Sequence, residues 1–128
     1  AGLQLAGEAR FGPWEAEWGR AAARLLLNDG AAFDAVICQN DVLARGCIEE
    51  LERNGCRVPQ DVAVIGHDNS PDYVSYAHPL LTSIDDNNEM LGRQAALCLL
   101  DAIAGHPHHG VERVPVKLIQ RESTLPLD

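Results

Sequence analysis

Two short apolar runs, at residues 34–39 and 62–66, flank a segment with the periodicity of an amphipathic helix. Each run is continuous and partly β-branched, which is typical of a strand buried within a sheet. Strand, helix and strand within about thirty residues form a parallel crossover unit, whose helices cover the sheet. We therefore expect an α/β fold built on a parallel sheet.

The helix between the two runs is predicted over residues 41–53. We expect Asp41 to cap its N-terminus and Asn54-Gly55 to end it, because glycine readily adopts the left-handed closing conformation. A first helix is predicted from Glu15 to Asn28, where apolar residues recur at steps of three and four.

The second half of the chain continues the pattern of strands and helices. A third strand is predicted at residues 79–84, a long helix ends at Ala104, and a last strand follows at residues 114–120. Asp86 and Glu89 stand three residues apart before the long helix, which predicts an acidic variant of the capping box.

The charge balance excludes one class of partner for these residues. The net charge is −9, with ten Lys and Arg against nineteen Asp and Glu, and Lys117 is the only lysine. Binding to a phosphate backbone is driven largely by clustered Lys and Arg, so we expect no nucleic-acid contact here. No apolar stretch approaches the roughly 20 residues that a membrane span requires, so we expect a soluble protein without membrane contact.

Four cysteines, Cys38, Cys47, Cys56 and Cys98, include no CxxC pair. Zinc sites and redox motifs use close pairs of cysteines. Disulfide-stabilised domains are usually shorter and richer in cysteine. We therefore expect buried free thiols and a cytoplasmic location.

The sequence contains no recognisable catalytic or cofactor motif. His106, His108 and His109 adjoin proline and glycine in one loop, and no acidic ligand stands at helical spacing, so we expect no metal there. A GxSxG elbow and a phosphate-binding loop are both absent. We expect no catalytic residue, no metal site and no cofactor.

Polar side chains follow the first two predicted strands. In open parallel sheets the ligand crevice lies beyond the carboxyl ends of the strands. Asn40 follows the first strand and Asp68 follows the second, and such side chains can bind neighbouring hydroxyls of a small polar ligand. For Asn40 a ligand contact and a structural role are both open, whereas for Asp68 we favour a ligand contact.

An aromatic side chain, Trp14, stands just before the first helix and off its apolar face. An aromatic plane beside carboxylates and amides suits a sugar or a nucleobase, whose faces stack while their edges form hydrogen bonds. Core packing is the alternative for Trp14. Trp18 lies on the helix and is expected in the core.

Several motifs follow one another in a characteristic order: FDAVICQNDVLARG at 33–46, GCRVPQDVAVIGHDN at 55–69, PLLTSI at 79–84, GRQAA at 92–96 and REST at 121–124. Together they closely resemble the C-terminal half of LacI/GalR-family regulators, and the resemblance covers nearly the whole chain. It implies the fold of periplasmic sugar-binding proteins, in which two α/β lobes enclose a ligand cleft.

The resemblance also implies roles for individual residues. Asn40 and Asp68 would line the cleft, and Trp14 would stack on the ligand. Residues 1–84 would belong mostly to the second lobe and residues 85–120 would return to the first. Asp85 and Asp86 would then lie near a hinge.

Two departures from the family pattern concern the predicted cleft. His67 stands where the family usually has Phe or Tyr after the Ile-Gly pair. Asp85-Asp86 replaces a more common basic residue and glutamine. These departures leave the identity of the effector open.

The resemblance implies a non-enzymatic sensor: the effector-binding part of a cytoplasmic transcriptional regulator, with a carbohydrate as effector. Operator DNA would be bound by an N-terminal domain that precedes Ala1. One alternative is an extracytoplasmic sugar-binding protein of a transport system. Another is a small α/β enzyme that uses Asp68 with His67.

The helix at 41–53 carries apolar residues on two sides, since Leu43 and Ile48 do not share a face with Val42. One side would cover the sheet. We expect the other side, together with Tyr73 and Tyr76, to form a homodimer interface, which the resemblance also implies. The alternative is that Leu43 and Ile48 pack under the lobe that is missing here.

Overall fold

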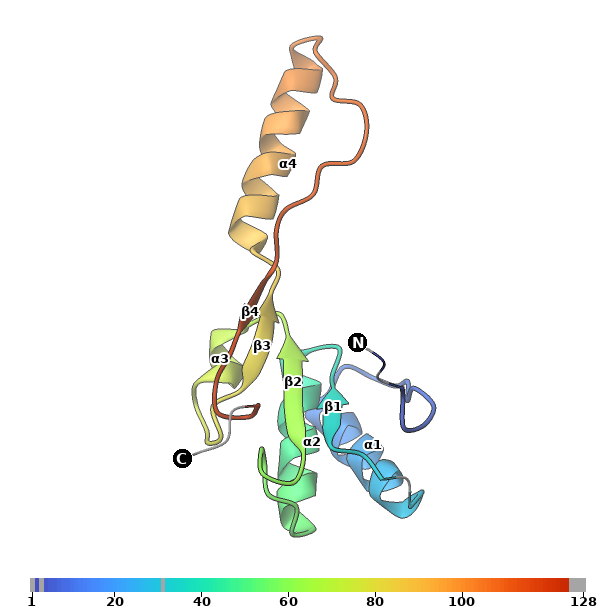
Figure 1. Cartoon of the computed structure of the whole chain (residues 1–128). Helices are drawn as coiled ribbons and strands as arrows, with labels where there is room; N and C mark the ends of the chain where they lie inside the picture. Colours follow the sequence, from blue (N-terminus) through green and yellow to red (C-terminus); the bar gives the residue numbers. More distant parts are fainter. Residues whose placement is uncertain (1, 3, 31, 125–128) are drawn as a thin grey trace.

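A computed structural model describes residues 2, 4–30 and 32–124 and contains one four-stranded sheet in the order β1-β2-β3-β4 (Figure 1). In chain order, the elements are α1 (Ala16–Asn28), β1 (Ala35–Ile37), α2 (Asp41–Arg53), β2 (Ala63–His67), α3 (Pro71–Val74), β3 (Thr82–Asp85), α4 (Asn88–Ile103) and β4 (Lys117–Ile119).

The first three strands run parallel, which confirms the predicted crossover unit and the α/β class. Ile37 pairs with Ile65, and Ile65 pairs in turn with Thr82. β4 pairs antiparallel with β3, and its register places Lys117 opposite Asp85. The carboxyl ends of β1, β2 and β3 therefore meet at one edge of the sheet.

Helices cover one face of this sheet, so burial alternates along β2. Val64 and Gly66 are buried on the side of α2, whereas Ile65 and His67 are half-buried on the other side. Ile37 of β1 is 74% exposed. The expectation of strands buried on both faces is therefore wrong for the described residues.

The core lies between the sheet and the helices. Its buried apolar residues are Ala23, Ala44, Cys47, Ile48, Leu51, Val58, Val62, Val64, Val74 and Leu81. Ile48 is only 3% exposed and belongs to this core, so it is buried within the single chain. The predicted role of Ile48 in a dimer interface does not agree with this burial, while Leu43 is half-buried.

Two glycines bring α1 and α2 into backbone contact. A Cβ on Gly46 would lie 2.0 Å from the carbonyl oxygen of Ala16, and a Cβ on Gly19 would lie 2.2 Å from that of Leu43. Only a residue without a side chain fits at either position. Ala23, one turn after Gly19 on α1, is fully buried.

The last described residues tie β2 to β3 at the ends of these strands farther from the predicted cleft. Ser123 is fully buried, its Oγ donates to the carbonyl of Val64 at 2.6 Å and it accepts from the amide of Thr82 at 2.8 Å. The backbone carbonyl of Ser123 also accepts from the amide of Val64. The REST segment therefore bridges the starts of β2 and β3.

A second part of the chain stands away from the sheet: α4 and the following segment extend beyond β3 and β4 (Figure 1). No residue of α4 is buried, and Leu99, Leu100 and Ile103 are more than 60% exposed. Among the described residues, no helix combines the length and apolar character needed to cross a membrane.

Both predicted helix caps are wrong in detail. Asn40, rather than Asp41, caps α2, and its side chain accepts from the amide of Leu43 at 2.8 Å. The N-cap of α4 is Asn87, in a left-handed conformation without a side-chain cap bond, so Asp86 forms no capping box.

The expectation of four buried thiols is partly wrong. All four cysteines are free, but only Cys47 is buried, while Cys38, Cys56 and Cys98 are half-buried. The pKa of Cys38 is raised well above its ordinary value, first by its hydrogen bond with Cys47 and then by burial. Cys38 is therefore protonated at neutral pH.

We predict that Gly46→Ala lowers the free energy of unfolding by about 1–3 kcal/mol, because the new methyl group would force the α1 and α2 backbones apart. Gly92→Ala in α4 is the matched control. Its Cβ would meet nothing within 4 Å, so we expect a gain of up to about 1 kcal/mol from helix propensity. Urea denaturation of both variants measures the difference, and equal effects would contradict the glycine contact.

Candidate ligand-binding site

Three loops meet at the carboxyl ends of the parallel strands. Asn40 follows β1, Asp68 follows β2 and Asp86 follows β3. The loop after β2 carries two consecutive residues in the left-handed region, Asp68 with φ 97° and Asn69 with φ 51°. Residues other than glycine rarely adopt this conformation, so neighbouring groups must hold the loop in place.

Three successive backbone amides fix this loop. The amide of Asp68 donates to the carbonyl of Ile84 at 2.9 Å. The amide of Asn69 donates to Oγ of Ser83 at 3.0 Å, and that of Ser70 donates to a carboxylate oxygen of Asp41 at 2.7 Å. Both β3 and the start of α2 therefore position Asp68.

Asp41 is the buried centre of this arrangement. It is 1% exposed, and its second carboxylate oxygen accepts from the hydroxyl of Ser83 at 2.6 Å. A Cβ on Gly66 would lie 2.2 Å from that same oxygen, so the carboxylate requires a glycine at the end of β2. Burial raises the pKa of Asp41 above its ordinary value, and the hydrogen bonds from Ser83 and Ser70 oppose that shift.

A second set of hydrogen bonds holds the Asn69 side chain beside Asp68. Nη2 of Arg121 donates to Oδ1 of Asn69 at 2.8 Å, while Nη1 donates to the carbonyl of Leu81. Nδ2 of Asn69 reaches Asp85 at 3.3 Å. Sequence reasoning missed Asp41, Asn69 and Arg121 as positioning residues, because their partners are distant in the sequence.

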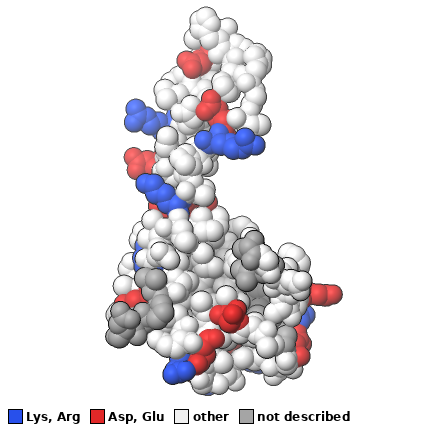
Figure 2. Space-filling model, in the orientation of Figure 1, with Lys and Arg blue, Asp and Glu red and all other residues white. Residues whose placement is uncertain are grey.

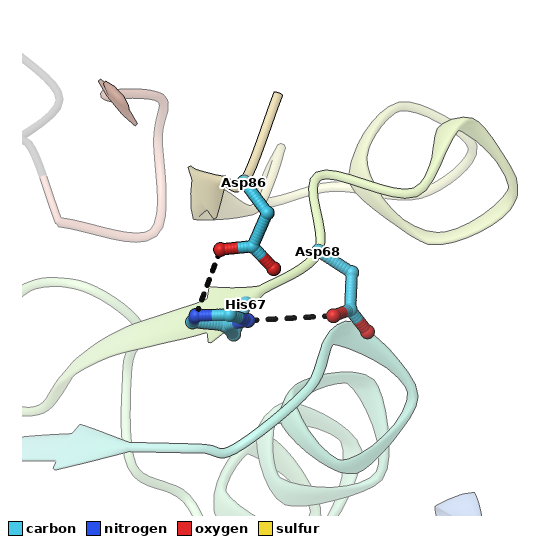
Figure 3. A group of neighbouring side chains, drawn as sticks. All are labelled: His67, Asp68 and Asp86. Carbon is cyan, nitrogen blue, oxygen red and sulfur yellow. Dashed lines mark hydrogen bonds and ion pairs between the residues drawn. The ribbon is translucent and has the colours of Figure 1, made fainter. Parts of the chain in front are cut away.

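His67 lies between the two carboxylates of the site. Its Nδ1 is 3.3 Å from Oδ1 of Asp68, and its Nε2 is 3.3 Å from Oδ1 of Asp86 (Figure 3). The side chains of His67, Asp68 and Asp86 are 35%, 48% and 29% exposed, so a small molecule can reach them.

The predicted ligand residues have different surroundings. Asp68 is exposed, and its carboxylate has only His67 as a hydrogen-bond partner among the described residues. Asn40 is 4% exposed and uses Oδ1 as the cap of α2, so only its Nδ2 remains for a ligand. Trp14 is 73% exposed, which excludes core packing, and no described hydrogen bond links it to Asn40 or Asp68.

The distribution of charge can be followed on one face of the molecule. On the face shown in Figure 2, the basic side chains of the described residues stand apart, and no basic stripe crosses them. Charged side chains of both signs are scattered over the protruding part. This face offers no continuous track for a phosphate backbone.

Residues 1–124 match the periplasmic binding protein-like domain family, and the chain belongs to this family. Its relatives are LacI-family transcriptional regulators. The regulator CelR of Thermobifida fusca is 36% identical over 114 residues, which cover 88% of this chain and 33% of CelR. The lactose operon repressor of Escherichia coli is 33% identical over 116 residues, which cover 91% of this chain and 32% of the repressor.

Solved structures show the same relationship. A dimeric Lac repressor with a C-terminal deletion superposes with a TM-score of 0.82 at 32% identity, over 89% of this chain and 42% of that one. A CelR–cellobiose complex superposes with a TM-score of 0.77 at 36% identity, over 88% of this chain and 34% of that one. The chain thus spans about a third of the length of the curated relatives it matches.

We predict that Asp41→Ala lowers the free energy of unfolding by about 1–3 kcal/mol, because it leaves the amide of Ser70 and the hydroxyl of Ser83 without their acceptor. Asp101→Ala, at an exposed position of α4, is the control and should change stability by less than about 0.5 kcal/mol. Chemical denaturation with a spectroscopic readout measures both variants. An equal effect would contradict the central role of Asp41.

The raised pKa of Asp41 also predicts a pH dependence. The folded state binds the proton of the Asp41 carboxyl more tightly than the unfolded state does. The resulting stabilisation is present below the ordinary pKa of 3.8 and is lost as pH rises through the raised pKa. Asp41→Asn removes this contribution. The stability of the wild type relative to Asp41→Asn should therefore fall as pH rises, and a constant difference would contradict the direction of the shift.

Proposed function

We propose that this chain is the effector-binding part of a sugar-responsive LacI-type transcriptional regulator and has no enzymatic role. The observation that carries the proposal is the meeting of three strand ends, with Asn40, Asp68 and Asp86 at one edge of the sheet. Carboxylate and amide groups in this arrangement suit the hydroxyls of a carbohydrate. CelR, a relative of the chain, has been solved with cellobiose.

The same residues are proposed to link effector binding to a change between lobes. Residues 85–120 would cross to a first lobe, against which the exposed apolar side chains of α4 would pack. Asp85 is the last residue of β3, and Asp86 is the first residue beyond it. A ligand that contacts both Asp68 and the first lobe would favour one arrangement of the two lobes. The size of this preference is the difference in the ligand's affinity for the two arrangements.

Operator DNA would be bound by a different part of the regulator, because the face shown in Figure 2 lacks a basic track and the net charge is −9. The parent protein would act in the cytoplasm. Effector occupancy would then change operator affinity without any bond being made or broken in the effector.

We also propose a homodimer that uses Tyr73, Tyr76 and Leu43 on the second lobe. Tyr76 is 62% exposed, and the guanidinium carbon of Arg45 lies 5.5 Å from the centre of its ring. Arg45 is buried and donates to the carbonyls of Tyr73 and Pro79, which holds this surface in shape. Ile48 is withdrawn from the interface, because it is buried within the single chain.

The effector proposal is tested by NMR titration of the full-length regulator, which contains both lobes of the cleft, with cellobiose, other mono- and disaccharides, and nucleosides. We expect a sugar to shift resonances at Asp68 and Asn40. Asp68→Ala should raise the Kd about tenfold to a hundredfold, since a charge-assisted hydrogen bond is lost. Asp72→Ala, an exposed change on α3, is the control. If no sugar binds, or if Asp68→Ala binds equally well, the proposal is wrong.

Sedimentation velocity tests the dimer. We expect the wild-type chain to form a dimer at micromolar concentrations and Tyr76→Asp to shift it to a monomer, because a charge is placed in an apolar contact. Leu100→Asp on exposed α4 is the matched control. If Leu100→Asp dissociates the dimer and Tyr76→Asp does not, association occurs through α4 and the proposed interface is wrong.

A further inference from the structure

We propose that His67, Asp68 and Asp86 bind a divalent transition-metal ion at the strand ends. One ligand atom from each of these residues lies within 4.8 Å of the other two. This inference concerns the ion alone, so it stands or falls independently of the proposed sugar effector.

The charge of the cluster favours a cation. Two carboxylates face one imidazole, so at least one negative charge remains uncompensated even when His67 is protonated. Among the described residues, no Lys or Arg lies within 4 Å of Asp68 or Asp86. The neighbouring Arg121 is already committed to Asn69 and Leu81.

The distances suit a small ion. Metal–ligand bonds of about 2.0 Å in a tetrahedral arrangement place neighbouring ligand atoms about 3.3 Å apart. Oδ1 of Asp86 already lies 3.3 Å from Nε2 of His67, and this pair is the less exposed half of the site. Asp68 faces the other ring nitrogen and is half exposed, and one of its carboxylate oxygens lies within 4.8 Å of the ligand atoms of His67 and Asp86.

The donor set indicates the class of ion. One imidazole nitrogen with two carboxylate oxygens suits zinc, cobalt or nickel better than magnesium or calcium, which prefer oxygen ligands alone. Three protein ligands leave a coordination position for water or a ligand hydroxyl. His67 at the end of β2 and Asp86 just beyond β3 are distant in the sequence, and the fold brings them together (Figure 3).

From the sequence alone we expect no metal site, because the loop with three histidines shows no recognisable metal-binding motif. Asp86 lies nineteen positions after His67 in the sequence, so no local motif joins them. Their contact arises only because β2 and β3 are neighbours in the sheet, with His67 opposite Ile84.

The test is a Co²⁺ titration of the 128-residue chain carrying His106→Asn, His108→Asn and His109→Asn, which removes the competing histidine loop. We expect one Co²⁺ per chain, with visible bands of nitrogen and oxygen ligands and without the intense near-ultraviolet band of thiolate ligands. Adding His67→Asn or Asp86→Asn should weaken Co²⁺ binding at least tenfold. Circular dichroism checks that each variant folds.

Two controls keep the result decisive. His78→Asn removes another His–carboxylate pair, in which Nδ1 of His78 lies 2.6 Å from Glu122, and should leave Co²⁺ affinity unchanged. Should His67→Asn and Asp86→Asn both fail to fold, Asp68→Asn at the exposed position serves in their place and should also weaken binding at least tenfold. Absence of Co²⁺ binding, thiolate bands, or undiminished binding in the folded variants overturns the proposal.

Discussion

The buried carboxylate of Asp41 organises the edge of the sheet on which function depends. It joins the start of α2, the loop after β2 and the side chain of Ser83 on β3 through two short hydrogen bonds. Asp41 is 1% exposed, and a buried polar group without a hydrogen-bond partner lowers the stability of the fold, so these two bonds matter to stability. Gly66 leaves room for the carboxylate of Asp41, because a side chain at this position would collide with it. The amide of Ser70 can then donate to Asp41, which helps to hold the loop that carries Asp68 in its rare backbone conformation.

Much of the fold could be predicted from local patterns. The helix at 41–53 has the predicted bounds, and α1 begins one residue later than expected, because apolar periodicity and stop signals act within a few residues. Three of the strands, β1, β3 and β4, are shorter than predicted, whereas β2 has the predicted length and begins one residue later. An apolar run shows where a strand can form, whereas hydrogen bonding to the neighbouring strand decides where it ends, and that information is not local.

The candidate site was predicted less completely, for a related reason. Asn40 and Asp41 are both good capping residues, so the sequence alone could not distinguish the cap from the buried anchor. The distinction depends on Ser70 and Ser83, which lie 29 and 42 residues away. Similarly, the second apolar side of α2 suggested a partner chain, but Ile48 is buried in the core of the single chain.

The position of Ser123 has a consequence for how the protein is made. Its hydroxyl bonds to Val64, 59 residues earlier, and α4 with its following segment is inserted between the two in the chain. During synthesis, β2 and β3 emerge well before the residues that tie them together. This part of the sheet therefore closes only after the protruding part has left the ribosome, and contacts of such long separation make folding slow relative to a chain with local contacts.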